Sequence, residues 1–141
     1  MKRTLVFLLA FSVALIVIRD VSIAVTSYLQ MQKAAEQSLD AAIIEASADA
    51  DRQRGKIRVD QGLARQTISR TMQQNLKTDN QLNNTTLHNS SLQVSITYVG
   101  DIPRIEMEYR SHVDFVLPRL FGMDTVQLSV KKNTPYLAEF L

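Results

Sequence analysis

The chain has 141 residues, of which 45% are hydrophobic and 21% charged, and it contains neither cysteine nor tryptophan. One domain of ordinary size fits this length, and the lack of cysteine excludes a disulfide scaffold, a thiol nucleophile and thiolate metal sites. With Lys2, Arg3, Arg19 and Asp20 set apart, residues 27–141 carry 13 basic and 13 acidic side chains, so this region lacks the basic surface of a nucleic-acid binding domain and we expect no nucleic-acid partner.

The chain begins with a long apolar segment. Lys2 and Arg3 precede the run LVFLLAFSVALIVI at residues 5–18, and Arg19-Asp20 and then VSIAV follow it. A membrane-spanning helix needs about 20 residues to cross about 30 Å of hydrocarbon, and residues 4–26 extend about 34 Å as a helix. Positive residues at the start hold an N-terminus in the cytoplasm. We therefore predict a single-pass transmembrane anchor at residues 1–26, with residues 27–141 outside the cytoplasm.

The same segment also fits a secretion signal. A positive start and an apolar run are followed by Ser22-Ile23-Ala24, an A-x-A-like cleavage site. Cleavage after Ala24 would release a soluble binding domain that recognises a ligand with its sheet face. The anchor is favoured because neither glycine nor proline occurs before Gly55, so the helix is expected to continue without a break.

Arg19 and Asp20 form a charged pair at the edge of the apolar run. Charges are costly inside a membrane, so such a pair needs an explanation. One interpretation is a salt bridge or a register contact with another helix of an assembly. The other is that the pair marks the membrane boundary.

Residues 27–54 predict an extracytoplasmic continuation of this helix. Apolar residues recur there with three-four spacing, which is typical of one buried helix stripe, and abundant alanine favours the helix. The stripe is narrow, so we expect it to pack closely against a sheet or a neighbouring helix. Gly55 is expected to end the helix as its C′ residue. The stripe consists of Tyr28, Met31, Ala35, Leu39, Ala42, Ile43 and Ala46.

Residues 55–141 are predicted to form a small α+β domain. Asp60 is a good N-cap for a second helix over residues 61–77. The polar residues 78–91 predict an exposed loop. The buried side of the helix is expected to contain Leu63, Ala64, Ile68, Met72 and Leu76.

From residue 92 onward the apolar residues recur with period two. This alternation predicts half-buried strands at residues 92–98, 105–115 and 126–131, and the short connections favour an antiparallel sheet of three to four strands. The two helices are the available covers for its apolar face. The apolar tail at residues 136–141 is expected to dock on the sheet or on a partner. Four aromatic residues are expected to fill the core rather than form a ligand-stacking patch: Tyr98, Tyr109, Phe115 and Phe121.

The sequence contains few candidates for chemistry. It has no nucleophile-elbow, phosphate-loop, zinc-protease or calcium-loop motif. His88, in the polar loop, and His112, on the polar face of a strand, are expected to be solvated. Glu106 and Glu108 are expected to form a solvent-facing charged row with the neighbouring arginines Arg104 and Arg110. We therefore expect no enzymatic activity, metal, cofactor or small-molecule substrate.

The whole arrangement resembles the TadE/TadG-like proteins, pseudopilin-like components of tight-adherence (Flp-type) pilus machinery. The resemblance lies in the apolar helix, the acidic Asp20 after it, and the Gln- and Ala-rich stretch LQMQKAAEQSLDAA at residues 29–42. Residues 59–76, followed by three strands with Leu120-Phe121-Gly122 before the last, are also similar to outer domains of this group. Pilin-type processing needs a small residue before the apolar run, and residues 1–4 contain no glycine, so we expect no prepilin-peptidase cleavage.

The resemblance implies a pilin-like fold with a long N-terminal membrane-spanning helix. It also implies a non-enzymatic structural or assembly subunit of a type IV (Tad/Flp-like) pilus, secretion or conjugation apparatus in the bacterial cell membrane. Expected partners are membrane lipid and other pilin-like or machinery proteins, in a hetero- or homo-oligomer. Whether the chain enters a filament or stays in the membrane is left open. The residues expected to serve helix packing and interaction are Arg19, Asp20, Met31, Ala35, Leu39 and Ala42.

Overall fold

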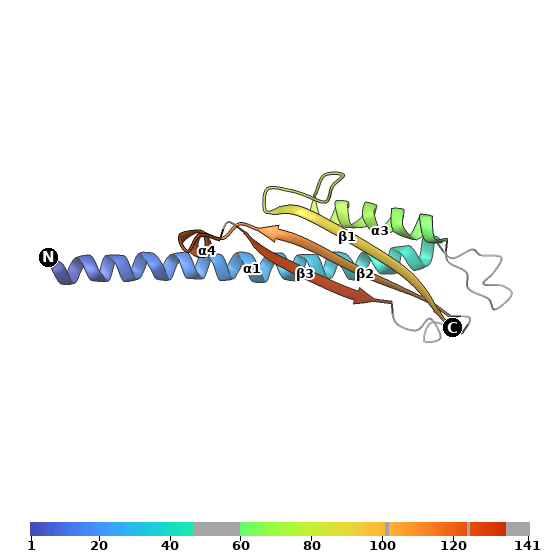
Figure 1. Ribbon diagram of the computed structural model, residues 1–141, viewed down its shortest axis with the longest axis horizontal. Helices are drawn as coiled ribbons and strands as arrows, with labels where there is room; N and C mark the ends of the chain where they lie inside the picture. The colour runs from blue at the N-terminus through green and yellow to red at the C-terminus, as the bar shows by residue number, and fades with distance from the viewer. Residues whose placement is uncertain (47–59, 101, 124, 135–141) are drawn as a thin grey trace.

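The computed structural model describes residues 1–46, 60–100, 102–123 and 125–134. These form an α+β structure with a long apolar N-terminal helix, a second helix and a three-stranded antiparallel sheet (Figure 1), which confirms the predicted class and order of elements. The elements are α1 (Lys2–Ala46), α3 (Gln61–Leu76), β1 (Leu87–Val99), β2 (Ile102–Val113), α4 (Val116–Leu120) and β3 (Val126–Asn133).

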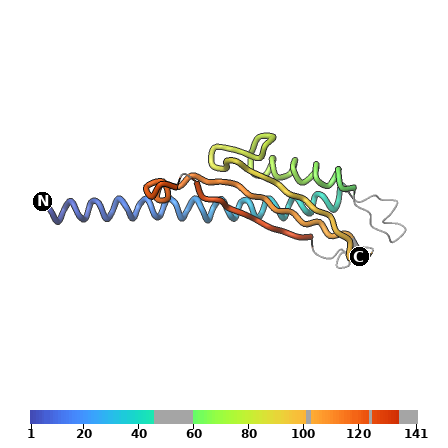
Figure 2. Tube along the Cα trace, viewed as in Figure 1, coloured from blue at the N-terminus to red at the C-terminus, as the bar shows by residue number. Residues whose placement is uncertain are grey.

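Helix α1 is continuous over 45 residues, a length of about 68 Å. No glycine or proline interrupts it, and the trace in Figure 2 keeps the helical coil from the N-terminus into the region covered by the sheet. Its N-terminal part extends beyond the rest of the molecule, whereas the later part lies along the sheet and α3 (Figure 1). The predicted helix residues 47–54 and the predicted end at Gly55 lie outside the described residues.

Helix α3 begins at the predicted N-cap. The Asp60 carboxylate accepts a hydrogen bond from the backbone N–H of Leu63 at 3.0 Å, which satisfies one of the free amides of the first turn. The predicted buried face is confirmed at Ala64, Ile68, Met72 and Leu76 but is wrong at Leu63, which is exposed. Thr67 is buried in addition, and its hydroxyl is satisfied by donating to Glu45 of α1 at 3.0 Å.

The sheet has the order β1-β2-β3, with β2 in the centre. Tyr109 of β2 pairs with Leu92 on one side and with Val130 on the other. The predicted inward residues of β2 are confirmed as buried: Ile105, Met107, Tyr109, Ser111 and Val113. Together with Met31, Ala35, Leu39 and Ala42 of the α1 stripe and with α3 they form one hydrophobic core, so the predicted covering of the sheet by the two helices is confirmed. The predicted stripe is wrong at Tyr28, which is 42% exposed.

Strand β1 is longer than predicted, since it begins at Leu87 and includes residues assigned to the polar loop. The reason is local side-chain bonding that ties the polar segment to the strand. The Asn84 side-chain oxygen accepts from the backbone N–H groups of Thr86 and Leu87, and that of Asn83 accepts from the N–H of Ser90. His88 therefore lies on a strand, opposite His112, and a bulge follows it.

Two of the four aromatic residues expected in the core are buried, Tyr109 and Phe115, whereas Tyr98 and Phe121 are exposed. The prediction was wrong at Tyr98 because the outer end of β1 is exposed. It was wrong at Phe121 because this residue follows the short helix α4 and has no strand partner. The apolar tail at residues 136–141, which was expected to dock, lies outside the described residues.

Tyr109 links the centre of the sheet to the loop before β1. Its hydroxyl donates to the carbonyl oxygen of Leu82 at 2.9 Å and lies 3.0 Å from the hydroxyl of Ser90. Burial raises the pKa of Tyr109 because it disfavours the phenolate. The folded chain therefore holds this phenol in its neutral, donating form.

We expect Tyr109→Phe to lower the free energy of unfolding by about 1–3 kcal/mol, because the buried Leu82 carbonyl loses its donor. Since the phenol pKa is higher in the folded state than in the unfolded one, wild-type stability declines as pH rises above about 10, where the unfolded phenol ionises. Because Tyr109→Phe has no phenol at this position, its stability should fall less than that of the wild type at alkaline pH. Urea unfolding at neutral and alkaline pH measures both effects, with Tyr28→Phe on the exposed face of α1 as the control. Equal stability of Tyr109→Phe and wild type would contradict the assignment.

Candidate functional site

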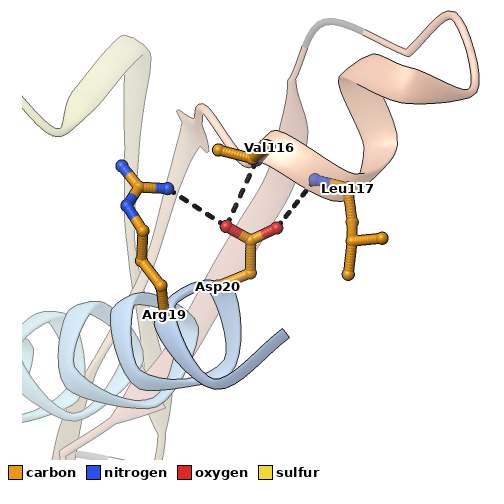
Figure 3. Close-up of polar contacts among 4 residues, drawn as sticks. All are labelled: Arg19, Asp20, Val116 and Leu117. Atoms are coloured by element: carbon orange, nitrogen blue, oxygen red, sulfur yellow. Dashed lines mark hydrogen bonds and ion pairs between the residues drawn. The ribbon is translucent and has the colours of Figure 1, made fainter. Parts of the chain in front are cut away.

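The most specific polar contact between distant parts of the chain joins α1 to α4. The Asp20 carboxylate accepts hydrogen bonds from the backbone N–H of Val116 at 3.2 Å and of Leu117 at 2.8 Å (Figure 3). The guanidinium of Arg19 contacts the same carboxylate at 3.1 Å. We call these four residues the Asp20 junction. Asp20 is only 7% exposed, although apolar residues surround it in the sequence.

The local sequence explains why α4 needs this carboxylate. The first amides of a helix have no acceptor within the helix and are normally capped by a nearby polar side chain. The N-cap residue here is Phe115, which makes no side-chain cap. Pro118 has no N–H, so Val116 and Leu117 carry the free amides at this end. Asp20 accepts from both, and its negative charge is also favourable at a helix N-terminus.

The structure gives the predicted Arg19–Asp20 pair a further role. The salt bridge is present, with the Arg19 side chain 55% exposed. The main partner of Asp20, however, is a segment of the same chain, 96 and 97 residues later. Sequence reasoning missed this contact. Two features of the sequence could have indicated it. Phe115 cannot cap the turn that follows it, and Asp20 is an acidic residue beside an apolar run that needs a partner.

The four other predicted interaction residues are buried within the chain. Met31, Ala35, Leu39 and Ala42 all belong to the hydrophobic core, and Ala35 is 0% exposed. Nearby, the Ser38 hydroxyl donates to the Ala35 carbonyl at 2.8 Å and lies 3.3 Å from the Met107 sulfur, so α1 touches β2 here. The expected contact with partner proteins through this stripe is therefore corrected to an intramolecular one, because α3 and the sheet already cover it.

Polar contacts fix the rest of this interface. Lys132 of β3 pairs with Glu36 of α1 at 3.0 Å, and Asn75 of α3 donates to Gln37 of α1 at 2.8 Å. Arg70 of α3 pairs with Glu45 near the end of α1. The later half of α1 is thus attached to both the sheet and α3.

The charged row on the sheet is organised as predicted. Glu106 pairs with Arg104 at 3.5 Å and Glu108 with Arg110 at 2.7 Å. The hydrogen bond from Arg110 lowers the pKa of Glu108, so this carboxylate is ionised at neutral pH. His88, predicted to be solvated in a loop, lies on β1 with its side chain 39% exposed, and its Nε2 is 3.4 Å from the Asp114 carboxylate. The prediction of a solvated His112 is wrong at its Nδ1, which is buried and has no hydrogen-bond partner among the described residues. In the part of the chain that the structure describes, no group of three or more histidine, aspartate or glutamate side chains is placed to hold a metal ion.

Exposed apolar surface is concentrated at the same end of the molecule as the Asp20 junction. Every residue from 5 to 18 is exposed except Ile16, which is half-buried. We call residues 5–18 the exposed apolar segment. Helix α1 is long and apolar enough to cross a membrane, and its most apolar 18-residue window has a mean hydropathy of 2.3 with 6% of it buried.

No protein-family model, curated protein or solved structure matches the chain.

Proposed function

We propose that this protein is a non-enzymatic, membrane-anchored, pseudopilin-like subunit of a bacterial type IV (Tad/Flp-like) pilus, secretion or conjugation apparatus. One observation carries the proposal: a single uninterrupted helix has an exposed apolar segment and then a buried stripe that carries the sheet domain. In this topology the N-terminus is cytoplasmic, the helix crosses the membrane once, and the sheet domain is outside.

The position at which the sheet domain begins to cover α1 supports a membrane span that ends before Asp20. Apolar patches of this size on a protein surface require a cover of lipid or protein. Residues 2–19 extend about 27 Å as a helix, close to the hydrocarbon thickness of about 30 Å. The sheet domain contacts α1 at Asp20, Ile23 and Ala24, so it overlaps the last part of the anchor predicted at residues 1–26. We therefore place the end of the span at Ile18 and Arg19.

The attachment of the domain suggests how such a subunit would work. Because α1 is continuous and its later half is fixed by the core and by ion pairs, a force on the anchor is transmitted to the sheet without a flexible linker. Contacts with partner subunits would then lie on the exposed apolar segment. Ala10 and Ala14 are exposed and four residues apart, a spacing that permits close helix approach in a membrane.

A photo-crosslinking amino acid at Ala14, in cells that make the complete apparatus, tests this function. We expect a covalent adduct with another pilin-like chain or a machinery membrane protein, identified by mass spectrometry. The same amino acid at Gln74, on the exposed face of α3, is the matched control and should give fewer such adducts. Adducts with lipid alone at Ala14 would count against a structural role in an assembly.

A second candidate is a secreted binding domain released by cleavage after Ala24, since a signal sequence shares the length, position and composition of this segment. Such cleavage would remove Asp20 and leave the Val116 and Leu117 amides without their acceptor. Ile23 and Ala24 also pack against the core. Both observations favour the uncut chain. The intact mass of the native protein distinguishes the two, because cleavage there removes 24 residues.

A further inference from the structure

The end of the sheet domain nearest the exposed apolar segment has an apolar surface of its own. We call residues 116–123 the α4 turn. Its Leu120, Phe121 and Met123 are 69%, 80% and 57% exposed. Among the described residues outside α1, these are the three most exposed large hydrophobic side chains. An exposed apolar surface of this kind normally marks a contact with another protein or with a membrane.

The Asp20 junction fixes where the α4 turn lies. Hydrogen bonds from Val116 and Leu117 to Asp20 attach the start of α4 to the helix just after the exposed apolar segment. In Figure 1, α4 lies beside α1 at the end of the sheet that faces the N-terminus. If the span ends at Arg19, the α4 turn is level with the outer membrane surface. A span that continued to residue 26 would place it deeper still.

The composition of the turn matches an interfacial segment. Residues 115–123 read FVLPRLFGM and contain Arg119 as their one charge, between the flanking Asp114 and Asp124. Apolar and aromatic side chains beside a cation are typical of segments that lie at the boundary between headgroups and acyl chains. Arg19, exposed next to the junction, adds a second cation at the same level.

We propose that the α4 turn is a membrane-contact element, which inserts Leu120, Phe121 and Met123 into the outer surface of the bilayer that α1 spans. Its occupant is lipid, with anionic headgroups near Arg19 and Arg119. The contact attaches the sheet domain to the membrane at a second point, in addition to α1. Because Asp20 joins α4 to α1, the two attachments together set the tilt of the domain relative to the membrane. This inference rests on the membrane anchoring in the proposed function.

The absence of tryptophan from the sequence allows a direct test. The full-length Phe121→Trp protein is reconstituted in vesicles of phosphatidylethanolamine and phosphatidylglycerol, and its emission is compared in vesicles with and without brominated acyl chains. We expect a blue-shifted emission and strong quenching by the brominated lipid. Because Phe121 is 80% exposed, the substitution should leave the fold intact.

Two matched variants separate the possible outcomes. Phe11→Trp reports the span itself, and Tyr98→Trp reports the far end of the sheet and should show neither shift nor quenching. Quenching at Phe11→Trp without quenching at Phe121→Trp would overturn the contact while leaving the anchor in place. A blue shift at Phe121→Trp without quenching would indicate a protein partner or a second copy and would also overturn it. If neither position is quenched, the anchor fails and the inference fails with it.

Discussion

Ala35→Glu is expected to abolish cooperative folding of the sheet domain. Ala35 is 0% exposed and lies where α1 meets β2, so a carboxylate there would be buried without a partner. An unpaired buried charge costs several kcal/mol, and the larger side chain adds about 1–3 kcal/mol of overpacking. Together these costs are comparable to the stability of about 5–15 kcal/mol that is typical of a whole protein. Circular dichroism and urea titration of the purified protein in detergent measure the loss.

Gln37→Glu is the matched control for this variant. It introduces the same side chain two residues away on the exposed face of α1, and the new carboxylate can still accept the hydrogen bond that Asn75 donates. We expect it to unfold like the wild type. If the stripe instead served contacts between proteins, purified Ala35→Glu would fold normally and fail only in assembly, and that result would refute the intramolecular assignment.

Asp20→Ala is expected to release the α4 turn from α1 while the core stays folded. The variant removes the only acceptor that the structure assigns to the Val116 and Leu117 amides. We expect hydrogen exchange at these two amides to become faster by about tenfold, the factor that follows from losing a helix cap. Asp20→Asn keeps one acceptor oxygen, so its exchange should be intermediate. Mass spectrometry of peptides that cover residues 115–123 reports the change.

Arg19→Gln is the control for the Asp20 variants. It removes the neighbouring cation but leaves both backbone hydrogen bonds of the carboxylate in place. Because the Arg19 side chain is largely exposed, its ion pair contributes little, and exchange at Val116 and Leu117 should stay close to wild type. Unchanged exchange in Asp20→Ala would mean that these amides find other acceptors, and the Asp20 junction would lose its assigned role.

Periodicity predicted most of the fold, because burial on a helix or strand face leaves a regular mark in the sequence. The three-four stripe from Met31 to Ala42 and the alternation from Ile105 to Val113 are both buried as expected. The start of β1 could not be predicted in the same way. Residues 88–91 are polar, and with Leu87 they join the strand through the asparagine side chains of the preceding loop, a contact that has no periodic signal.

The candidate site was predicted only in part. The cost of an acid beside an apolar run identified Asp20, and its salt bridge with Arg19 is present. Its backbone partners are 96 and 97 residues away and contribute amides, which every residue type except proline carries, so their side chains give no signal. The stripe that contains Ala35 and Ala42 was recognised as a packing surface. Small residues indicate close packing, but they do not tell whether the packed element belongs to the same chain or to a partner protein.

The spacing between Asp20 and α4 has a consequence for synthesis. A growing polypeptide presents the Asp20 carboxylate first, whereas the amides of Val116 and Leu117 follow 96 and 97 residues later and the pairing strand β3 comes after them. Until then the stripe on α1 has no complete sheet to cover it, and distant pairings of this kind form slowly. The domain is therefore expected to complete its folding only after β3 has been made, and the nascent helix would need protection from wrong associations in the interval.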